Sequence, residues 1–220
     1  MENKVYNPEN VLSPVHLNIL SAIKPGSRVL EVGSASGYMT HELSQELNCE
    51  VTAVEISPSA AQQSSQWANT QIIGDITKAD TREQIIGRFD SILFCDVLEH
   101  LADPWETLRW CKDKLNNGGQ VLASLPNIAH YKIRLKLLMG EFDYEPFGIL
   151  DDSHLRFFTC KSAKELFQKS GYEITAFEGV CQGINEDRIK KYLPCLVSYQ
   201  FVIHSIISKA NDIENPSAAE

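Results

Sequence analysis

The stretch VLEVGSASGYMT, residues 29–40, decides the prediction of the fold. Its first four residues suit a buried β-strand, although Glu31 among them is an acid. Gly33 and Gly37 then let the backbone turn sharply and approach a ligand closely, and the following helix points its N-terminus and free amides at the loop. Strand, bare loop and helix in this order predict the first unit of an open α/β sheet, with a ligand at the carboxyl ends of the strands.

The same alternation of strand and helix continues along the chain. Ser57 and Pro58 open one expected helix, and Asp103 and Pro104 open another, because Ser and Asp cap helices and Pro fits the first turn. Five such repeats predict a doubly wound, Rossmann-like α/β domain. The expected strands cover residues 28–32, 50–56, 70–75, 89–96 and 120–126, and the expected helices cover 8–23, 37–47, a segment after 58, and 103–115, with NNGG at 116–119 as the stop signal.

The pattern changes after Pro126. Residues 127–159 mix an amphipathic stretch with aromatic and acidic residues, and we interpret them as a cover and substrate insertion after the fifth strand. Residues 160–180 restore a helix and a strand, and the apolar run 193–207 is expected to be the last strand. The chain is therefore predicted to hold a single domain over 1–207, while 208–220 lack an apolar period and are predicted to be a disordered tail.

Composition excludes several classes of protein. A chain of 220 residues with 43% hydrophobic and 22% charged residues is typical of one soluble globular domain, and no apolar run is long enough to cross a bilayer. The first ten residues lack the apolar core of a signal peptide, so we expect a cytoplasmic protein. A formal charge of -9 argues against a nucleic acid as partner, because phosphate binding requires a basic face.

The cysteines lie far apart, without a Cys-x-x-Cys pair or a nearby histidine at zinc spacing. They are predicted to be buried thiols in a reducing compartment. No set of carboxylates and histidines stands out at ligand spacing, so no metal is expected. The six residues are Cys49, Cys95, Cys111, Cys160, Cys181 and Cys195.

The spacing within the glycine loop separates two kinds of ligand. A dinucleotide fingerprint requires glycine where this chain has Ala35 and Tyr38, so a pyrophosphate is disfavoured. The loop instead reads acid-x-Gly-x-x-x-Gly, and here the sequence resembles the class I S-adenosylmethionine-dependent methyltransferases. In that family the acid, here Glu31, lies near the amino group of the methionine part. The family's usual middle glycine is Ala35 in this chain.

The later strands agree with this resemblance. Glu55 ends the second strand at the spacing where an acid meets ribose hydroxyls, which a carboxylate can bind in pairs. The resemblance implies that Asp75 in GDI meets the adenine amino group and that Ile76 packs on the ring, and CDVLEHL at 95–101 resembles the fourth-strand motif. It also implies a mainly parallel seven-stranded sheet with an antiparallel last strand. The implied cofactor residues are Glu31, Gly33, Ser34, Ala35, Gly37, Tyr38, Glu55, Ile56, Asp75, Ile76, Asp96 and Val97.

Each of these residues also has a purely structural interpretation. Gly33 and Gly37 are also found in simple turns, and Glu55 also suits a surface position at a strand end. Asp96 and Glu99 also suit helix caps or solvated charges. The order of the motifs along the chain favours the cofactor interpretation over these alternatives.

The second half carries a finer resemblance. The segments 96–108, 122–144 and 148–159 together resemble bacterial methyltransferases associated with surface-polysaccharide (O-antigen) biosynthesis, and the resemblance spans about residues 28–205. It implies methylation of an O or N atom of a sugar-like or other small-molecule acceptor. The alternatives are a quinone-type O-methyltransferase with a phenolic acceptor, a protein methyltransferase, and a non-catalytic S-adenosylmethionine sensor or partner subunit.

Methylation of a hydroxyl needs a base near neutral pKa, and three histidines follow strands or lie in the insertion. His154 and His130 are the favoured candidates, with His100 behind them. The alternatives are structural: His100 packs or caps beneath the cofactor, His130 caps a helix, and His154 holds the insertion through Asp151 or Asp152.

The segment YKIRLKLLM, residues 131–139, alternates basic and apolar side chains. It fits a membrane-facing or anion-contacting helix, but core packing with solvated Lys and Arg heads is favoured. The aromatic residues Tyr38, Tyr131, Phe142, Tyr144 and Phe147 line an acceptor pocket or, as favoured, fill the core of the cover. The expected partners are a small-molecule or glycan acceptor and a second copy in a homodimer, without nucleic acid or a membrane span.

Overall fold

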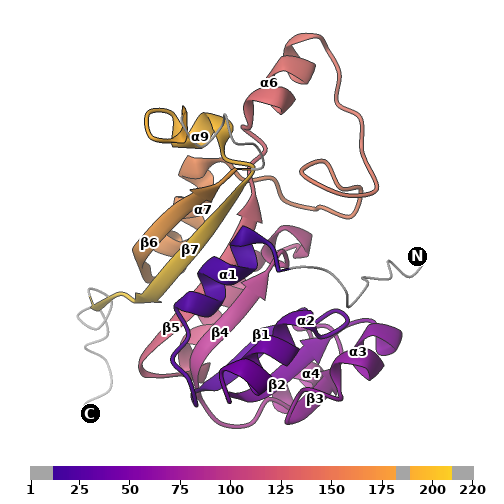
Figure 1. Ribbon diagram of the computed structural model, residues 1–220, viewed down its shortest axis with the longest axis vertical. Helices are drawn as coiled ribbons and strands as arrows, with labels where there is room; N and C mark the ends of the chain where they lie inside the picture. The colour runs from indigo at the N-terminus through magenta and orange to yellow at the C-terminus, as the bar shows by residue number, and fades with distance from the viewer. Residues whose placement is uncertain (1–11, 182–188, 210–220) are drawn as a thin grey trace, which may run out of the picture.

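The computed structural model describes residues 12–181 and 189–209. Its strands are β1 (Arg28–Val32), β2 (Glu50–Glu55), β3 (Thr70–Ile73), β4 (Phe89–Cys95), β5 (Leu115–Pro126), β6 (Tyr172–Val180) and β7 (Gln200–Ile207). They form one seven-stranded sheet in the order β3-β2-β1-β4-β5-β7-β6 (Figure 1). Neighbours from β3 to β5 are parallel, and β7 runs antiparallel to β5 and β6. The predicted mainly parallel sheet with an antiparallel last strand is confirmed.

Helices cover both faces of this sheet. Leu30 and Val32 of β1 pack with α5 and α7 on one face, whereas Val29 packs with α1 and α2 on the other. Because side chains alternate along a strand, Glu31 points to the same face as Val29. The helices are α1 (Pro14–Ser21), α2 (Tyr38–His41), α3 (Pro58–Ser64), α4 (Ala79–Glu83), α5 (Pro104–Cys111), α6 (Tyr131–Leu138), α7 (Cys160–Lys169) and α9 (Pro194–Val197), with the short turns η1 (Glu42–Glu46), η2 (Leu98–His100) and η3 (Lys112–Lys114).

The predicted helix starts are confirmed by their caps. The side chain of Ser57 accepts a hydrogen bond from the backbone of Ala60, and Pro58 is the first residue of α3. The side chain of Asp103 accepts a hydrogen bond from the Glu106 amide at 2.9 Å at the start of α5. These local bonds satisfy amides that the first turn of a helix leaves without intrahelical partners.

Several predicted boundaries are wrong. The helix expected from Pro8 begins at Pro14 in the described residues, because Ser13 caps it. NNGG does not precede β5 but lies within it, where the pairing with β4 shifts register between Phe89 and Ser91. The last strand does not begin near Leu193, because Pro194 starts the short helix α9 and β7 begins only at Gln200. The tail prediction falls mostly on residues 210–220, which lie outside the described residues.

The prediction of six free thiols is also wrong. Cys160 at the start of α7 forms a disulfide with Cys195 of α9. Cys49 and Cys111 are buried free thiols as expected, whereas Cys95 is only half-buried. The sequence could not indicate this pair, because the two segments meet only through the packing of the sheet.

The insertion leaves the sheet beyond the carboxyl end of β5. Asn127 pairs with Phe158, so both ends of the insertion lie side by side, and α6 stands clear of the sheet (Figure 1). Core packing of α6 was the favoured prediction and is wrong for most of the helix, because only Ile133 is buried there. Phe142, Tyr144 and Phe147, which were expected to fill the core of the cover, are also exposed. The exposed apolar side chains of this region are Leu135, Leu137, Leu138, Met139, Phe142, Tyr144 and Phe147. Within the described residues, no helix has the length and apolarity to span a membrane.

Candidate active site

The carboxyl ends of four adjacent parallel strands form the edge where the sequence predicted a ligand. The chain order reverses between β1 and β4, and the strands β3, β2, β1 and β4 lie next to one another there. This is the switch point at which open α/β sheets bind ligands. The residues that follow these strands therefore come together although they lie far apart in sequence.

The loop of residues 33–37, which we call the cofactor loop, is shaped by two glycines. Gly33 has φ 79°, and a Cβ there would lie 2.5 Å from Cγ2 of Val97. Gly37 has φ 90°, and a Cβ there would lie 2.6 Å from Cα of Ser64 in α3. The glycines thus do more than turn the chain, since they let the loop lie against the residues after β4 and against α3. Ala35, between them, adopts the left-handed φ of 46° that favours glycine.

Glu55 fixes the cofactor loop from the end of β2. Its two carboxylate oxygens accept hydrogen bonds from the amides of Ala35 and Ser57, both at 2.8 Å. Glu55 is buried, which contradicts the alternative of a surface acid. Since a carboxylate has about four acceptor sites, both oxygens keep capacity for the two hydroxyls of a ribose.

Glu31 is a buried acid beneath α2. One of its oxygens accepts a hydrogen bond of 2.6 Å from the hydroxyl of Thr40. Burial raises the pKa of Glu31 to about 8, against the hydrogen bond from Thr40, which lowers it, and with a further increase from the charge of Glu55. A buried acid of this kind is stabilised in its charged form by a cation, such as the amino group that the resemblance places nearby.

An acid and an isoleucine follow the third strand, and a second isoleucine follows β2. Oδ1 of Asp75 accepts hydrogen bonds from both the amide and the hydroxyl of Thr77, each 2.8 Å long, which orients the carboxylate. Ile76 is 4% exposed and packs in the main core, so its contact with an adenine stays a prediction. Ile56, after β2, is 66% exposed and leaves an apolar face available for such a ring.

Other residues of the loop have internal partners. The hydroxyl of Ser34 donates to Ser64 at 3.1 Å, and the Tyr38 ring packs on His16, 4.8 Å between ring centroids. The roles of Ser34 and Tyr38 toward a cofactor stay predictions. Ser36 was missed by sequence reasoning, and its buried hydroxyl has no hydrogen-bond partner among the described residues. Its place in the cofactor loop was the only sequence signal, and it makes Ser36 a candidate donor to a ligand.

Asp96 and Val97 connect the cofactor loop to the end of β4. Asp96 has a left-handed φ of 54°, and its carboxylate accepts hydrogen bonds from Ser124 at 2.6 Å and Gln200 at 2.7 Å. Non-glycine residues held in this conformation store strain and are enriched at functional sites. The bonds from β5 and β7 hold the chain here, immediately before the turn η2.

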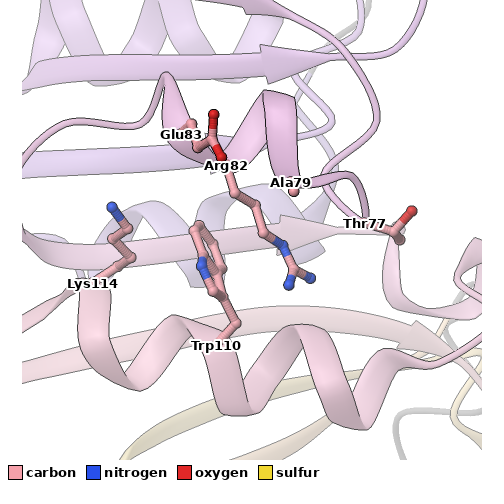
Figure 2. A pocket seen from close by; sticks show the side chains of 6 residues that line it. All are labelled: Thr77, Ala79, Arg82, Glu83, Trp110 and Lys114. Carbon is pink, nitrogen blue, oxygen red and sulfur yellow. The ribbon is translucent and has the colours of Figure 1, made fainter.

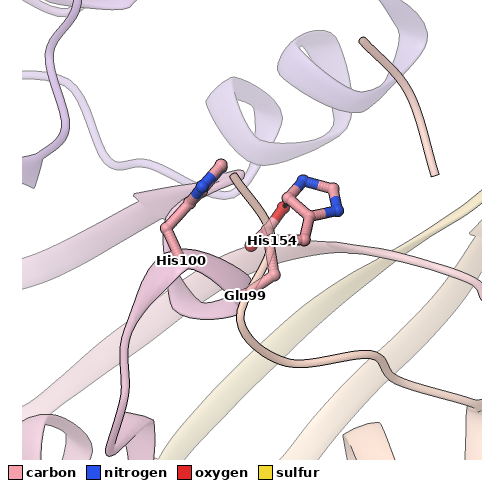
Figure 3. A group of neighbouring side chains, drawn as sticks. All are labelled: Glu99, His100 and His154. Atoms are coloured by element: carbon pink, nitrogen blue, oxygen red, sulfur yellow. Dashed lines mark ion pairs between the residues drawn. The ribbon is translucent and has the colours of Figure 1, made fainter. Parts of the chain in front are cut away.

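Three titratable side chains, Glu99, His100 and His154, form what we call the acceptor cluster (Figure 3). Glu99 and His100 belong to η2, and His154 comes from the insertion, with its Nε2 3.9 Å from Oε1 of Glu99. One ligand atom from each residue lies within 4.8 Å of the others. The sequence shows no carboxylate and histidine set at ligand spacing, but the fold brings together three such groups that the sequence separates. The expectation that no metal is bound stays a prediction.

The candidate bases differ in their surroundings. His130 is 2% exposed, and its Nδ1 accepts the Lys132 amide at 3.4 Å, so it acts as the N-cap of α6. Nδ1 of His154 lies 3.2 Å from the carbonyl of Ile149, and because a carbonyl only accepts, this nitrogen donates and carries a proton. Burial, followed by the charge of His100, lowers the pKa of His154. His154 is thus held as a neutral imidazole with Nε2 available.

A family model described as "Methyltransferase domain" matches residues 7–176 of the chain. The chain belongs to this methyltransferase domain family. A ubiquinone biosynthesis O-methyltransferase of Xanthomonas campestris pv. campestris is 28% identical over 145 residues, covering 61% of this chain and 59% of the relative. A protein of the same description from Xanthomonas axonopodis pv. citri is 29% identical over 141 residues, with the same coverage. The methyltransferase chain thus spans about 59% of the length of these relatives.

Solved methyltransferase structures share the fold. The CcbJ methyltransferase from Streptomyces caelestis aligns with a TM-score of 0.65 at 14% identity, covering 93% of this chain and 94% of the other. Magnesium protoporphyrin IX methyltransferase from Synechocystis, with bound S-adenosylhomocysteine, aligns with a TM-score of 0.60 at 16% identity, covering 88% and 80%. The domain is that of an S-adenosylmethionine-dependent methyltransferase, and its cofactor is S-adenosylmethionine.

The site residues of this methyltransferase fit that cofactor. The amino acid part of the cofactor matches the buried acid Glu31 in charge, and its ribose matches the acceptors of the Glu55 carboxylate. The Ser36 hydroxyl, which has no partner among the described residues, adds a hydrogen-bond donor. Asp75 and the exposed Ile56 stand where the adenine is expected. When bound, the cofactor would supply an electrophilic methyl group, and these residues are the ones predicted to hold it in place.

A surface depression of about 420 Å³ lies between α4 and α5 (Figure 2), and one of its lining residues, Thr77, also donates to Asp75 of the candidate site. Arg82 forms two hydrogen bonds of 2.6 Å with Glu106 and lies over the ring of Trp110. Lys114 donates to the carbonyl of Ile85 at 2.6 Å. Both cations are engaged within the protein, so the depression is a packing feature of the methyltransferase.

Proposed function

We propose that this chain transfers the methyl group of S-adenosylmethionine to a hydroxyl oxygen of a small acceptor. The observation that carries the proposal is the position of the acceptor cluster. It follows β4 directly, and Val97, which precedes the cluster, touches Gly33 of the cofactor loop. A hydroxyl held at the cluster therefore lies on the cofactor's side of the sheet edge.

The reaction needs the acceptor oxygen about 3 Å from the methyl carbon in a site that excludes water. The new O–C bond forms as the S–C bond breaks, and the hydroxyl proton passes to Nε2 of His154. The lowered pKa of His154 keeps this imidazole neutral near pH 7, which is the state that accepts a proton. The carboxyl of Glu99 is buried, and its Oε1 lies 3.9 Å from Nε2 of His154, next to the imidazolium that forms.

The insertion favours an acceptor with a polar head and an apolar chain. Exposed Leu138, Met139 and Phe147 offer apolar contacts, and the side chains of Lys132 and Arg134 of α6 are exposed as well. A lipid-linked sugar has this chemistry, in agreement with the resemblance of the second half to surface-polysaccharide methyltransferases. This acceptor is the first candidate.

The second candidate is a phenol with an apolar chain. It is favoured by the relatives named ubiquinone biosynthesis O-methyltransferases. Both candidates present a hydroxyl to the acceptor cluster, but a phenol is more acidic than a sugar hydroxyl and depends less on a base. The proposal includes a cytoplasmic location, which cell fractionation would check. It also includes a homodimer, which light scattering would check.

The test measures the release of S-adenosylhomocysteine with two panels of acceptors. One panel holds nucleotide-linked and lipid-linked sugars, and the other holds prenylated phenols. We expect turnover with one of the two panels. The turnover rate should fall by about 100-fold or more in His154→Ala, while the affinity for S-adenosylhomocysteine is unchanged. His41→Ala is the matched control, because His41 also lies beside a carboxylate, 3.1 Å from Glu42, but outside the acceptor cluster. Equal turnover in His154→Ala and the control would reject the assigned base, and turnover with neither panel would reject both acceptor classes.

A further inference from the structure

The two parts of the acceptor cluster are locked together by backbone bonds. The carbonyl of Glu99 accepts hydrogen bonds from the amides of Leu155 and Arg156, both 2.9 Å long. Nδ1 of His100 lies 3.2 Å from the carbonyl of Ser153. The insertion is therefore fixed against η2 at this point, so the convergence of the three side chains is a built feature of the fold.

Glu99 lacks the partners that a buried acid needs. It is 1% exposed, and neither of its oxygens has a hydrogen-bond partner among the described residues. Burial, together with the charge of Asp96, raises the pKa of Glu99 well above its usual range. A buried carboxylate without such partners costs several kcal/mol, and the neutral ring of His154, with Nε2 3.9 Å from Oε1 of Glu99, offsets little of that cost.

The two imidazoles are oriented as metal ligands are. Nδ1 of His154 faces the Ile149 carbonyl and Nδ1 of His100 faces the Ser153 carbonyl, each at 3.2 Å. Because a carbonyl only accepts, each Nδ1 carries a proton, and in the neutral ring this leaves the lone pair on Nε2 for a metal ion. A histidine that binds a metal through one ring nitrogen usually donates a hydrogen bond from the other, often to a backbone carbonyl.

The spacing is close to that of a metal site. The ligand atoms of Glu99, His100 and His154 lie within 4.8 Å of one another. Ligand atoms around one tetrahedral ion with bonds of 2.0–2.2 Å stand about 3.4 Å apart. Side-chain rotations that move the atoms inward by about 1 Å therefore complete the set.

We propose that Glu99, His100 and His154 bind one zinc-type divalent ion. Two imidazoles and one carboxylate suit Zn²⁺ rather than Mg²⁺, which prefers oxygen ligands, and three protein ligands leave a position open. The ion also supplies the positive charge that Glu99 lacks. Binding of the ion rests on this geometry alone and not on the proposed reaction.

The consequence for catalysis does rest on the proposed function. With the ion bound, His154 is a ligand and no longer the proton acceptor. An acceptor hydroxyl in the open position has a lowered pKa and releases its proton to solvent. Removal of the ion by a chelator would then slow methyl transfer without weakening the binding of the cofactor.

The test is titration of chelator-treated protein with ZnCl₂ by calorimetry. We expect saturation at one ion per chain. The affinity for Zn²⁺ should fall by about 100-fold or more in Glu99→Gln and His154→Ala, because loss of a residue that merely contacts a metal ligand already lowers metal affinity by about 10–100-fold. His41→Ala, the surface control, should bind as the parent does. The half-buried His100 allows a further variant, His100→Ala, that disturbs the core least.

Affinity for S-adenosylhomocysteine is measured on the same samples and reports whether each variant is folded. Absence of saturable Zn²⁺ binding in the folded parent would overturn the proposal, as would binding that all three folded variants retain. Zn²⁺ binding without turnover in either acceptor panel would support the metal site and reject the proposed function. The two failures are therefore distinguishable.

Discussion

The cofactor loop and the acceptor cluster lie side by side at one edge of the sheet, but they are stabilised in opposite ways. In the loop, glycines fit against Val97 and α3, and the Ala35 amide has the Glu55 carboxylate as its partner. In the cluster, Glu99 is buried without a hydrogen-bond partner. The difference indicates that the backbone of the loop is fixed before a ligand arrives, with only the Ser36 hydroxyl still lacking a partner among the described residues, whereas the buried acid of the cluster is compensated only when a ligand is bound.

The largest expected effect comes from filling the space that the loop needs. Gly37→Ala places a methyl group 2.6 Å from the Cα of Ser64 at a φ of 90°, and the free energy of unfolding should fall by about 3 kcal/mol or more. Gly26→Ala is the control, because Gly26 also has a positive φ, 74°, but nothing within 4 Å, and it should cost about 1 kcal/mol. Urea denaturation measures both, and equal losses would show that contact with α3 does not matter.

The acceptor cluster should respond in the opposite direction. Glu99→Leu removes a buried polar group without hydrogen-bond partners, so the metal-free protein should gain about 1–3 kcal/mol in its free energy of unfolding. Turnover and Zn²⁺ binding should be lost in the same variant. A destabilised Glu99→Leu protein would mean that the carboxyl has a compensating partner, and the contrast between loop and cluster would fail.

The acid beneath the loop gives an intermediate effect that depends on pH. Because the folded-state pKa of Glu31 is raised to about 8, its contribution to the stability of the unliganded protein is full below its ordinary pKa and is lost as pH rises through about 8. Ionised Glu31 pairs with the cofactor's amino group, so affinity for S-adenosylhomocysteine should rise about tenfold between about pH 6.5 and pH 8.

Glu31→Gln is the control for this profile. The neighbours Thr40, Glu55 and Cys95 are unchanged in it, so calorimetric affinities should be weaker and nearly independent of pH. A parent affinity that stays constant or falls over the same range would contradict the assignment of Glu31 to the amino group.

The smallest effect tests the one residue at which the loop is strained. Ala35→Gly relieves a left-handed φ of 46° but adds backbone freedom to the unfolded chain. The two effects partly cancel, so we expect a gain of about 0–1 kcal/mol in the free energy of unfolding. A clear loss would show that the Ala35 methyl group makes a stabilising contact.

The sequence could predict the loop better than the cluster, for physical reasons. The spacing of Glu31, Gly33, Gly37 and Glu55 follows from strand length and turn geometry, which are local properties. His154 approaches Glu99 only because the insertion folds back and donates backbone bonds to η2, and no local pattern encodes that return. For this reason the grouping of Glu99 with two histidines could not be seen in the sequence.

The same limit explains other differences. The Cys160–Cys195 pair joins segments that meet only in the folded sheet. The sequence could not predict that α6 is exposed, because alternating basic and apolar residues suit a packed helix as well as an exposed one. Caps such as Ser57 and Asp103, by contrast, act within one turn and were predicted correctly.

The place of β7 has a consequence for how the protein folds. This strand, Gln200–Ile207, is the last strand of the described residues but lies between β5 and β6 in the sheet. Until it pairs, β5 and β6 each expose an unpaired edge, and such edges promote aggregation. Synthesis must therefore run past Ile207 before the sheet closes, so the slow step in folding is expected to be this late strand insertion rather than assembly of the cofactor site.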